Sequence, residues 1–556
     1  MSLIRVNMTK KEVISETFPK DKIIGGRAMI DYLLTEFACL CAHPLSEKSL
    51  FVVAPGLLSG TAAPQSGRIS VGGKSPLTGG IREANSGGTA AHKLSRLGIR
   101  AIMVEGKSRE LQILKVNSQG ATFEDAMDIV GMTNYAACDK LRQHFGEKIS
   151  IMITGPAGER KLANSTVAIT DLEGRPSRHA ARGGIGAIMG AKGLKAIVID
   201  DSQGALRKAA NEGAFKKAAK AATEVIKKGH LTEPLHNLGT SLFVDIDNGR
   251  GSLPTYNHRM GSFDKYQNIN AERLTEVIKG RCGSMGHSCM PGCVVRCSNV
   301  FNNSDGNFVT AALEYETIAM IGSNLGIDDL DAIARIDRKC DELGIDTIEL
   351  GCAVGVLNDA GLFNFGDSEK VEGLIEEIAM GTPMGRIIGS GVAVTAKIFG
   401  IERIPAVKGL GIPAHAARSC KGWGVTYATS PQGADHTAGP VFDDPLSPEG
   451  QGERSRMSQI AMAAFDATGL CLYTFLREAP DVIVSMINAF YGIDWTVEDY
   501  MKMGKEMLRK ERVFNLNTGI GPAADRLPDW MSTEPLPPTN AVFDVPQKDI
   551  DAVFDF

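Results

Sequence analysis

The sequence of 556 residues lacks the features of membrane-spanning, secreted and nucleic-acid-binding proteins. It contains no run of about 18 apolar residues, the length that predicts a transmembrane helix. The first residues, MSLIRVNMTKKEV, contain no apolar segment of the kind that signal peptides carry. Neither sign of charge dominates, because 60 basic residues are balanced by 65 acidic ones. We therefore expect a cytoplasmic protein that binds neither a nucleic acid nor a membrane surface.

Cysteine is also scarce, since 11 cysteines are too few for a disulfide scaffold in a chain of this length. Thiols in a reducing cytoplasm bind metal more often than they form disulfides, so closely spaced cysteines become candidates for metal ligands. The remaining composition, with 43% apolar and 22% charged residues, is typical of a folded globular protein.

The distribution of strand and helix patterns predicts an α+β protein with three domains. We expect a strand-rich N-terminal domain over residues 1–204, a mainly helical domain over 205–410 and a second helical domain over 411–556. The clearest strand patterns fall at residues 50–54, 101–105, 111–116, 149–154 and 196–200. Helices are predicted at residues 89–97, 215–228, 331–343, 371–380 and within about 456–512, and several end at a glycine. Residues 405–455 are predicted to be long loops, and no internal repeat is apparent apart from one pair of motifs.

The most informative segment is Cys289-Met-Pro-Gly-Cys293-Val-Val-Arg-Cys297. Its Pro-Gly pair prevents a regular helix, and a tight loop can direct three thiols toward one iron–sulfur cluster with a fourth, remote ligand. A zinc site is the alternative, although zinc favours a second distant pair of cysteines, and incidental cysteines are another. Cys282 is a possible substitute ligand. The fourth ligand must be one of Cys39, Cys41, Cys138, Cys340, Cys352, Cys420 and Cys471.

Two distant segments share the pattern D-x-x-G-[LI]-[DC], namely Asp341-Glu-Leu-Gly344-Ile345-Asp346 and Asp466-Ala-Thr-Gly469-Leu470-Cys471. Read alone, either segment is an ordinary helix C-terminus that ends at glycine. Read together, they predict that two equivalent segments hold the two halves of one ligand. The second motif ends in Cys471, which we therefore choose as the fourth cluster ligand.

These motifs, with the cysteine-rich loop upstream, resemble the tungsten-containing aldehyde ferredoxin oxidoreductase family over nearly the whole chain. The other segments that resemble the family are Ile24-Gly25-Gly26-Arg27, Pro55-Gly-Leu-Leu-Ser-Gly-Thr61, Ser66-Gly-Arg68, Lys74-Ser-Pro-Leu-Thr-Gly79, Asn85-Ser-Gly87-Gly88, Arg182-Gly-Gly-Ile-Gly-Ala187, Glu314-Tyr-Glu316-Thr, Tyr427-Ala-Thr-Ser430, the His436 segment and Glu511-Arg-Val-Phe-Asn515.

The resemblance implies a tungsten or molybdenum centre held by two pterins in the N-terminal domain, with a [4Fe–4S] cluster nearby. It implies that Asp341 and Asp466 each bind one pterin, with Gly344, Asp346, Gly469 and Leu470 in the same motifs. Arg68 and Arg182 match arginines near the pterin phosphates, and an arginine fork suits phosphate oxygens. The segments around a bridging Mg²⁺ correspond to Asn85, Gly87, Gly88, Gly183, Gly184 and Gly186. Surface ion pairs for the arginines and a nucleotide loop for the glycines are the alternatives.

The implied reaction is the oxidation of an aldehyde to a carboxylic acid, with electrons passing to ferredoxin or a similar carrier. The candidates for the base that takes the proton are Glu314, Glu316 and His436. The two glutamates lie in a segment that resembles the family, and a histidine, with an ordinary pKa of about 6.5, suits proton transfer around neutral pH. Residues two apart on a helix point to different faces, so only one glutamate should face the site, and Glu314 is preferred. A solvated glutamate and a structural loop histidine are the alternatives.

Three departures from the family pattern bear on the expected function. The cysteine spacing is C-x3-C-x3-C rather than C-x2-C-x3-C, residues 334–338 lack the Glu-x-x-His of iron-bridged dimers, and Gly411 stands where the family usually has Glu. We therefore expect no iron-bridged dimer, although other oligomers are possible. Two other functions stay open: a low-potential reduction of an acid, thioester or aromatic ring in the same fold, and a non-catalytic iron–sulfur electron-transfer subunit.

Overall fold

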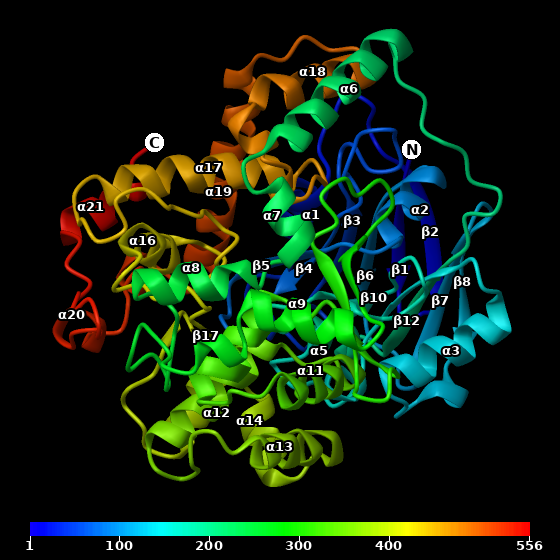
Figure 1. The fold of residues 1–556 in the computed structure, drawn as a ribbon. Helices are drawn as coiled ribbons and strands as arrows, with labels where there is room; N and C mark the ends of the chain where they lie inside the picture. The colour runs from blue at the N-terminus through cyan, green and yellow to red at the C-terminus, as the bar shows by residue number, and fades with distance from the viewer.

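The computed structural model describes residues 1–556 and confirms the α+β class (Figure 1). Twelve strands precede residue 200, and the rest of the chain is mainly helical. No helix combines the length and the apolar character that crossing a bilayer requires.

The first half of the N-terminal region forms a six-stranded sheet in the order β2-β1-β6-β3-β4-β5. Its strands are β1 Ser2–Asn7, β2 Glu12–Thr17, β3 Phe51–Pro55, β4 Ile69–Lys74, β5 Ile81–Ser86 and β6 Ile99–Glu105. Strand β3 is buried on both faces, because Phe51 and Val53 pack toward α2 (Ala90–Arg96) while Val52 packs toward α1 (Gly26–Phe37). Because successive side chains point to opposite faces and both faces are buried, every residue of β3 is apolar, and this continuous apolar run is the pattern from which the strand was predicted.

The second half forms another six-stranded sheet, in the order β8-β7-β12-β9-β10-β11. Its strands are β7 Gln112–Asn117, β8 Gly120–Asp125, β9 Ser150–Ile153, β10 Val167–Ile169, β11 Arg178–Ala180 and β12 Leu194–Ile199. Its helices are α3 Asn134–Phe145, α4 Pro156–Glu159 and α5 Ile185–Ala191. In each half the first and last strands are parallel neighbours and the other pairs are antiparallel.

The two sheets therefore repeat one topology, and the prediction of no internal repeat is wrong at the level of the fold. The repeat escapes a reading of the sequence because strand order is set by burial and pairing, which many different apolar side chains satisfy. One apolar core joins the two sheets, since it contains Phe51 and Val71 of the first and Met152 and Ile197 of the second.

Helices make up most of the remaining chain. They are α6 Glu212–Lys228, α7 Thr232–Leu238, α8 Leu242–Arg250, α9 Ala271–Gly280, α10 Tyr315–Thr317, α11 Leu330–Leu343, α12 Thr347–Asp359, α13 Ser368–Met380, α14 Pro383–Gly389, α15 Val392–Ile398, α16 Lys421–Thr429, α17 Gln451–Asp466, α18 Pro480–Tyr491, α19 Val497–Asn517, α20 Trp530–Thr533 and α21 Gln547–Asp551. The helices predicted from glycine-terminated patterns are confirmed in α6, α11 and α13. Gly344 and Gly381 end α11 and α13 with φ values of 72° and 73°.

The mainly helical region also contains a few strands, and one local prediction is wrong. A three-stranded sheet of β13 Ser284–His287, β14 Ser298–Asn302 and β15 Phe308–Ala311 interrupts the helical region, and a small hairpin joins β16 Ala406–Val407 to β17 Leu410–Gly411. Helix α16 lies inside the segment predicted as loops. Its sequence, KGWGVTYAT, favours helix weakly, but all nine residues are buried, so tertiary packing stabilises it.

A buried ion pair ties the N-terminal region to the C-terminal helices. Arg27 of α1 donates two hydrogen bonds of 2.8 Å to the carboxylate of Glu511 in α19, and its third nitrogen lies 3.2 Å from Asp466 Oδ2. The side chains of Arg27 and Glu511 are 2% and 0% exposed, so neither charge can be solvated by water if its partner is removed.

We expect Arg27→Ala to lower the free energy of unfolding by about 3–5 kcal/mol, the usual cost of leaving one buried charge without its partner. Calorimetry of the purified variants measures the change. The control is Arg5→Ala, which breaks an exposed pair with Glu16 at 3.4 Å and should cost no more than about 1 kcal/mol. Equal, small losses in both variants would contradict this account of the pair.

Candidate active site

A cavity of about 390 Å³ opens between the two halves of the N-terminal region and the helices. Many residues predicted from the sequence line it: Arg68, Asn85, Gly87, Arg182, Cys289, Cys297, Glu314, Glu316, Asp341, Asp346, His436, Asp466, Leu470 and Cys471. The predicted residues that do not line it are Gly88, Gly183, Gly184, Gly186, Cys293, Gly344 and Gly469. The fold therefore brings segments from positions 68 to 471 to one place.

Four thiols gather at one end of this cavity. Cys289, Cys297 and Cys471 line it, and Cys293 packs directly against Cys471. The neighbouring Cys293 thiol, with Arg178 and Arg68 nearby, lowers the pKa of Cys289 to about 6 despite its burial. By contrast, contact with Cys289 and burial raise the pKa of Cys293, and burial raises the pKa of Cys297 and of Cys471. Four thiols in one place nevertheless have the chemistry of a soft-metal or iron–sulfur ligand set, because a bound cation stabilises thiolates.

Gln65 holds the cysteine loop and Cys471 together. Its side-chain oxygen accepts hydrogen bonds from the backbone N–H groups of Val294 and Val295 at 3.1 and 3.0 Å, and its backbone oxygen accepts from Cys471 N at 3.0 Å. Its φ of 49° places the side chain and the backbone oxygen on these two partners. The only sequence signal for Gln65 was its position next to the Ser66-Gly-Arg68 segment.

Each D-x-x-G motif packs against the chain that follows the third strand of one half. A Cβ atom on Gly56, just after β3, would lie 2.2 Å from Gly469 N, and a Cβ on Gly155, just after β9, would lie 2.3 Å from Leu343 O. Both positions therefore require glycine, because the two backbones touch. The paired motifs thus pack against equivalent places in the duplicated unit.

The two motif carboxylates have different neighbours. Asp341 Oδ1 lies 3.0 Å from His179 Nε2, whereas Asp466 faces Arg27. Burial, followed by the nearby Glu83 carboxylate, raises the pKa of Asp466 to about 7 although Arg27 opposes this shift. Asp466 therefore titrates near neutral pH rather than in the acidic range usual for a carboxyl group.

The two predicted phosphate arginines are both fixed by the protein. Arg68 donates to the backbone oxygen of Asn85 at 2.8 Å and to its side-chain oxygen. Arg182 is buried, donates to Gly411 O at 2.7 Å and lies 3.5 Å from Asp346 Oδ2. Neither residue is a surface ion pair, and each presents its guanidinium to the cavity from a held position.

Glycines 183, 184 and 186 allow the chain after Arg182 to pass close to its neighbours. A Cβ on Gly184 would lie 2.3 Å from Ala163 O, and one on Gly186 would lie 2.2 Å from Thr166 O. Residues 163–166 in turn hold the first D-x-x-G motif, since Thr166 N donates to Gly344 O at 2.9 Å. In this structure these glycines therefore support the motif rather than the cavity wall.

Both glutamates of the E-Y-E-T segment line the cavity, so the expectation that only one could face it is wrong. Glu314 is in an extended conformation before α10 begins, and the rule for residues two apart on a helix does not apply to it. Its carboxylate accepts a hydrogen bond from Thr240, next to Cys297. Glu316 instead lies 3.7 Å from His436 Nδ1. The geometry favours Glu316, not Glu314, as the partner of the histidine.

The Glu316–His436 pair has unused hydrogen-bonding capacity. Glu316 Oε2 accepts from Ala414 N at 3.0 Å, but Glu316 Oε1 and His436 Nδ1 are buried without a partner. Buried polar atoms are costly unless something satisfies them, so these two atoms point to a polar ligand in the cavity.

A second network behind this pair was missed in the sequence. Tyr315 O–H donates to Asp247 Oδ2, which also lies 2.6 Å from His415 Nδ1, and Ser252 O–H donates to Asp247 Oδ1 at 2.9 Å. Burial disfavours protonation of His415, but the Asp247 carboxylate outweighs it, and the pKa of His415 is raised. The three residues are about 70–170 positions apart in the chain, and no short motif could have linked them.

Family models describe nearly the whole chain. The aldehyde ferredoxin oxidoreductase N-terminal domain matches residues 3–201, and domains 2 and 3 of the same family match residues 217–555. The chain belongs to the aldehyde ferredoxin oxidoreductase family. It is an oxidoreductase of that family, and the resemblance seen in its motifs is confirmed.

Curated relatives agree with the aldehyde ferredoxin oxidoreductase assignment. The chain is 32% identical to a tungsten-containing aldehyde ferredoxin oxidoreductase of Thermococcus kodakarensis and 33% identical to one of Pyrococcus abyssi. Both alignments cover 96% of this chain and 91% and 92% of the relatives. The BamBC active-site complex of benzoyl coenzyme A reductase shares the fold at 19% identity, with a TM-score of 0.83 over 100% of this chain and 92% of that one.

The structure places two residues that set this chain apart, the possible substitute ligand Cys282 and the glycine at position 411. Cys282 is exposed and does not line the cavity. Next to Gly411, where the sequence lacks the expected Glu, another residue supplies a carboxylate: Glu349 Oε2 accepts a hydrogen bond from Gly411 N at 2.9 Å. A Cβ at this position would lie 3.0 Å from that oxygen.

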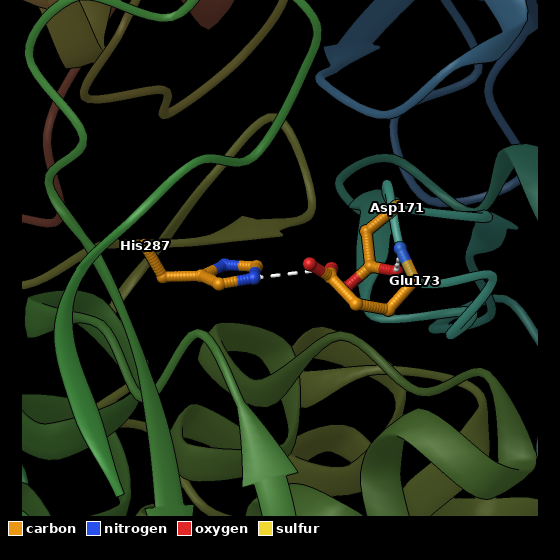
Figure 2. Close-up of side chains that lie close together, drawn as sticks. All are labelled: Asp171, Glu173 and His287. Atoms are coloured by element: carbon orange, nitrogen blue, oxygen red, sulfur yellow. Dashed lines mark hydrogen bonds and ion pairs between the residues drawn. The ribbon is translucent and has the colours of Figure 1, made fainter.

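A further polar group lies behind the cysteine loop, where Asp171, Glu173 and His287 have ligand atoms within 4.8 Å of one another (Figure 2). Asp171 is already used, since it accepts hydrogen bonds from the N–H groups of Glu173 and Arg175. The guanidinium of Arg178 lies 3.3 Å from His287 Nδ1 and disfavours a cation there. We interpret the group as structural. Glu173 contacts His287 at 3.1 Å and so holds the end of β13, which lies two residues before Cys289.

Proposed function

We propose that this protein oxidises an aldehyde to a carboxylic acid at a tungsten or molybdenum bis-pterin centre and passes the electrons through one [4Fe–4S] cluster to ferredoxin or a similar carrier. The observation that carries the proposal is the convergence of four thiols, two equivalent motif carboxylates and the Glu316–His436 pair on one cavity. The relatives whose names include tungsten and aldehyde support the choice of metal and substrate.

The residues fit the proposed cofactors. Cys289, Cys293, Cys297 and Cys471 would ligate the cluster, and Asp341 and Asp466 would accept hydrogen bonds from the two pterins. Arg68, Arg182 and the Asn85–Gly88 segment would lie near the pterin phosphates and the Mg²⁺, with the remaining motif glycines keeping the loops in place. When bound, the metal centre would supply two-electron chemistry and the cluster would supply one-electron transfer.

The chain itself would manage water and protons. An aldehyde and one water give a carboxylic acid, two electrons and two protons, so a base must remove protons near the substrate. Glu316 and His436 have buried, unsatisfied atoms in the cavity and can hold a proton between them. The Tyr315–Asp247–His415 network would keep the backbone around Glu316 in position, because Tyr315 O–H also donates to Ala414 O at 2.6 Å.

We also propose the division into residues 1–204, 205–410 and 411–556, with the cavity between the three parts. Separate family matches to residues 3–201 and 217–555 support the first boundary. Residues 334–338 of α11 contain no Glu-x-x-His pair, so we propose no iron-bridged dimer.

The direct test is metal analysis and turnover of anaerobically purified protein. We expect tungsten or molybdenum, iron and pterin in the protein, and reduction of a viologen dye with aldehydes as electron donors. Iron without tungsten, molybdenum and pterin would instead indicate an electron-transfer subunit.

We expect Asp466→Ala and Asp341→Ala each to lower the pterin and tungsten content while the protein stays folded. Each charged hydrogen bond to a pterin N–H is worth about 1.5–3 kcal/mol in a site shielded from water. Arg27 keeps both bonds to Glu511 when Asp466 is removed, so the helix packing should survive. Circular dichroism checks the fold, and Asp331→Ala, at an exposed ion pair with Arg281, is the control. Full cofactor retention in both motif variants would contradict the role.

A further inference from the structure

A second and larger cavity, of about 870 Å³, adjoins the first. Five residues line both cavities: Phe243, His415, His436, Leu472 and Tyr473. The two cavities thus meet at His436, the residue paired with Glu316. A ligand that fills the second cavity can extend one end to the candidate base.

Aromatic side chains form one part of the wall of the second cavity. Phe243, Trp423, Phe442, Tyr473 and Phe475 line it. Trp423 is held between two rings. The His415 ring stacks on it with 3.9 Å between ring centroids, and the Phe442 ring contacts it edge-to-face with 4.6 Å between centroids. Rigid aromatic walls select flat rings, because edge-to-face and offset contacts add to the burial of apolar area.

Apolar side chains at the outer part of this cavity are exposed to solvent. Phe442 is 42% exposed and Met457 is 48% exposed, and both line the cavity. Exposed apolar side chains that gather around a concave site typically mark the place where a ligand covers them. The second cavity therefore fits a bulky apolar group better than a small aldehyde such as acetaldehyde.

Arg477 is one of six charged residues that also line this cavity, with Arg250, Asp443, Glu453, Arg454 and Glu478. It makes no hydrogen bond or ion pair with the protein, and its Nη1 atom is buried without a partner. Burial lowers its pKa, and the neighbouring Glu478 opposes the shift without forming an ion pair. By contrast, Arg454 on the same cavity is paired with Asp444 at 2.7 Å. An unpaired, half-buried guanidinium is costly unless a ligand supplies the acceptor, and its planar fork matches an acid group.

We propose that the second cavity holds the remote part of the substrate, and that the substrate is an aromatic aldehyde with an anionic group that Arg477 binds. The inference rests on the proposed function for the aldehyde end and on the second cavity for the aromatic and anionic parts. His436 and Tyr473 mark the junction, so the formyl group points to the first cavity and the acid group to Arg477.

Binding is tested on the holoenzyme with probes that cannot react. Calorimetric titrations compare 4-methylbenzoate with 4-methylbenzamide, and 4-phenylbutanoate with 4-phenylbutanamide, so that two spacer lengths are sampled. In at least one pair the acid should bind about 10- to 100-fold more tightly than the amide, as expected for charge-assisted hydrogen bonds to an arginine. Arg477→Gln should remove this preference, and Arg477→Lys should retain part of it.

The matched control is Arg273→Gln, on α9, where the side chain is 49% exposed and pairs with Glu276. This variant should keep the full preference for the acid. Equal affinities for acid and amide in both pairs, or a preference that survives Arg477→Gln, would overturn the proposal.

Turnover separates this inference from the proposed function. The wild-type enzyme should oxidise at least one anionic substrate, either 4-carboxybenzaldehyde or a homologue with a longer spacer before the acid, with a kcat/KM about 10- to 100-fold above that of benzaldehyde. Arg477→Gln should lower kcat/KM for the anionic substrates only. If the acids bind as expected but no aldehyde is oxidised by protein that contains tungsten and iron, the proposed reaction is wrong and the anion site stands. If neutral and anionic aldehydes react alike and bind alike, the reaction stands and the anion site is wrong.

Discussion

Cys471→Ala is expected to lose most of its cluster iron and nearly all of its aldehyde turnover. Cys471 packs against Cys293, and Cys289 and Cys297 line the same end of the cavity, so alanine would leave three thiols where a cubane needs four. The loss should exceed the roughly 10–100-fold cost of removing a residue that only supports a metal ligand. Iron analysis and the visible and electron paramagnetic resonance spectra of anaerobic protein report the change independently of turnover.

Cys138→Ala provides the matched control, because Cys138 is also fully buried but lies in the core of the second sheet beside Ala137 and Leu141. It should keep its iron and spectrum. A Cys471→Ala protein with full iron and an unchanged spectrum would show that the fourth ligand lies elsewhere. The next choices are poorly placed, since Cys282 is exposed, Cys420 is buried in a different core cluster, and neither lines the cavity.

The second large effect concerns the proton acceptor, where Glu316→Gln and His436→Ala should each reduce turnover by about 10²–10⁴-fold. Glutamine keeps the bond to Ala414 N but cannot take a proton, and alanine at 436 removes the imidazole that faces Glu316 at 3.7 Å. Tungsten and iron must be measured in the same samples, because a disordered loop would mimic the loss.

Glu314→Gln is the informative comparison, two residues away on the same segment. Its carboxylate is bonded to Thr240 and faces the thiols, so we expect a smaller loss of turnover than in Glu316→Gln. Near-normal turnover in both the Glu316 and the His436 variants would mean that no side chain acts as the base.

Individual helices and strands could be predicted from the sequence better than the order of the strands in the sheets. Helices such as α11 and α13 were predictable, because an apolar face and a terminal glycine define them within the segment itself. Strand β3 was predictable because it is buried on both faces. The sheet order was not, since pairing depends on contacts between residues far apart, and α16 was missed because burial rather than propensity stabilises it.

The candidate site was predictable where a motif is contiguous. The cysteine loop, the paired D-x-x-G segments and the E-Y-E-T segment all reach the cavity as expected. Asp247, His179 and His415 lie in segments that seemed ordinary, and only the fold brings them to the motif residues. The choice between Glu314 and Glu316 also needed the structure, because it depends on where α10 begins.

The duplicated N-terminal unit has one further consequence. Asp346 and Cys471 end the two equivalent motifs, yet Asp346 caps α12 and faces Arg182, whereas Cys471 lies among the thiols. Two matching halves on their own would make the cavity the same from either side. A carboxylate in one motif and a thiol in the other give it polarity: with the proposed ligands, a cluster can form beside the second motif only. Electrons would then leave the cavity on the side of the second motif.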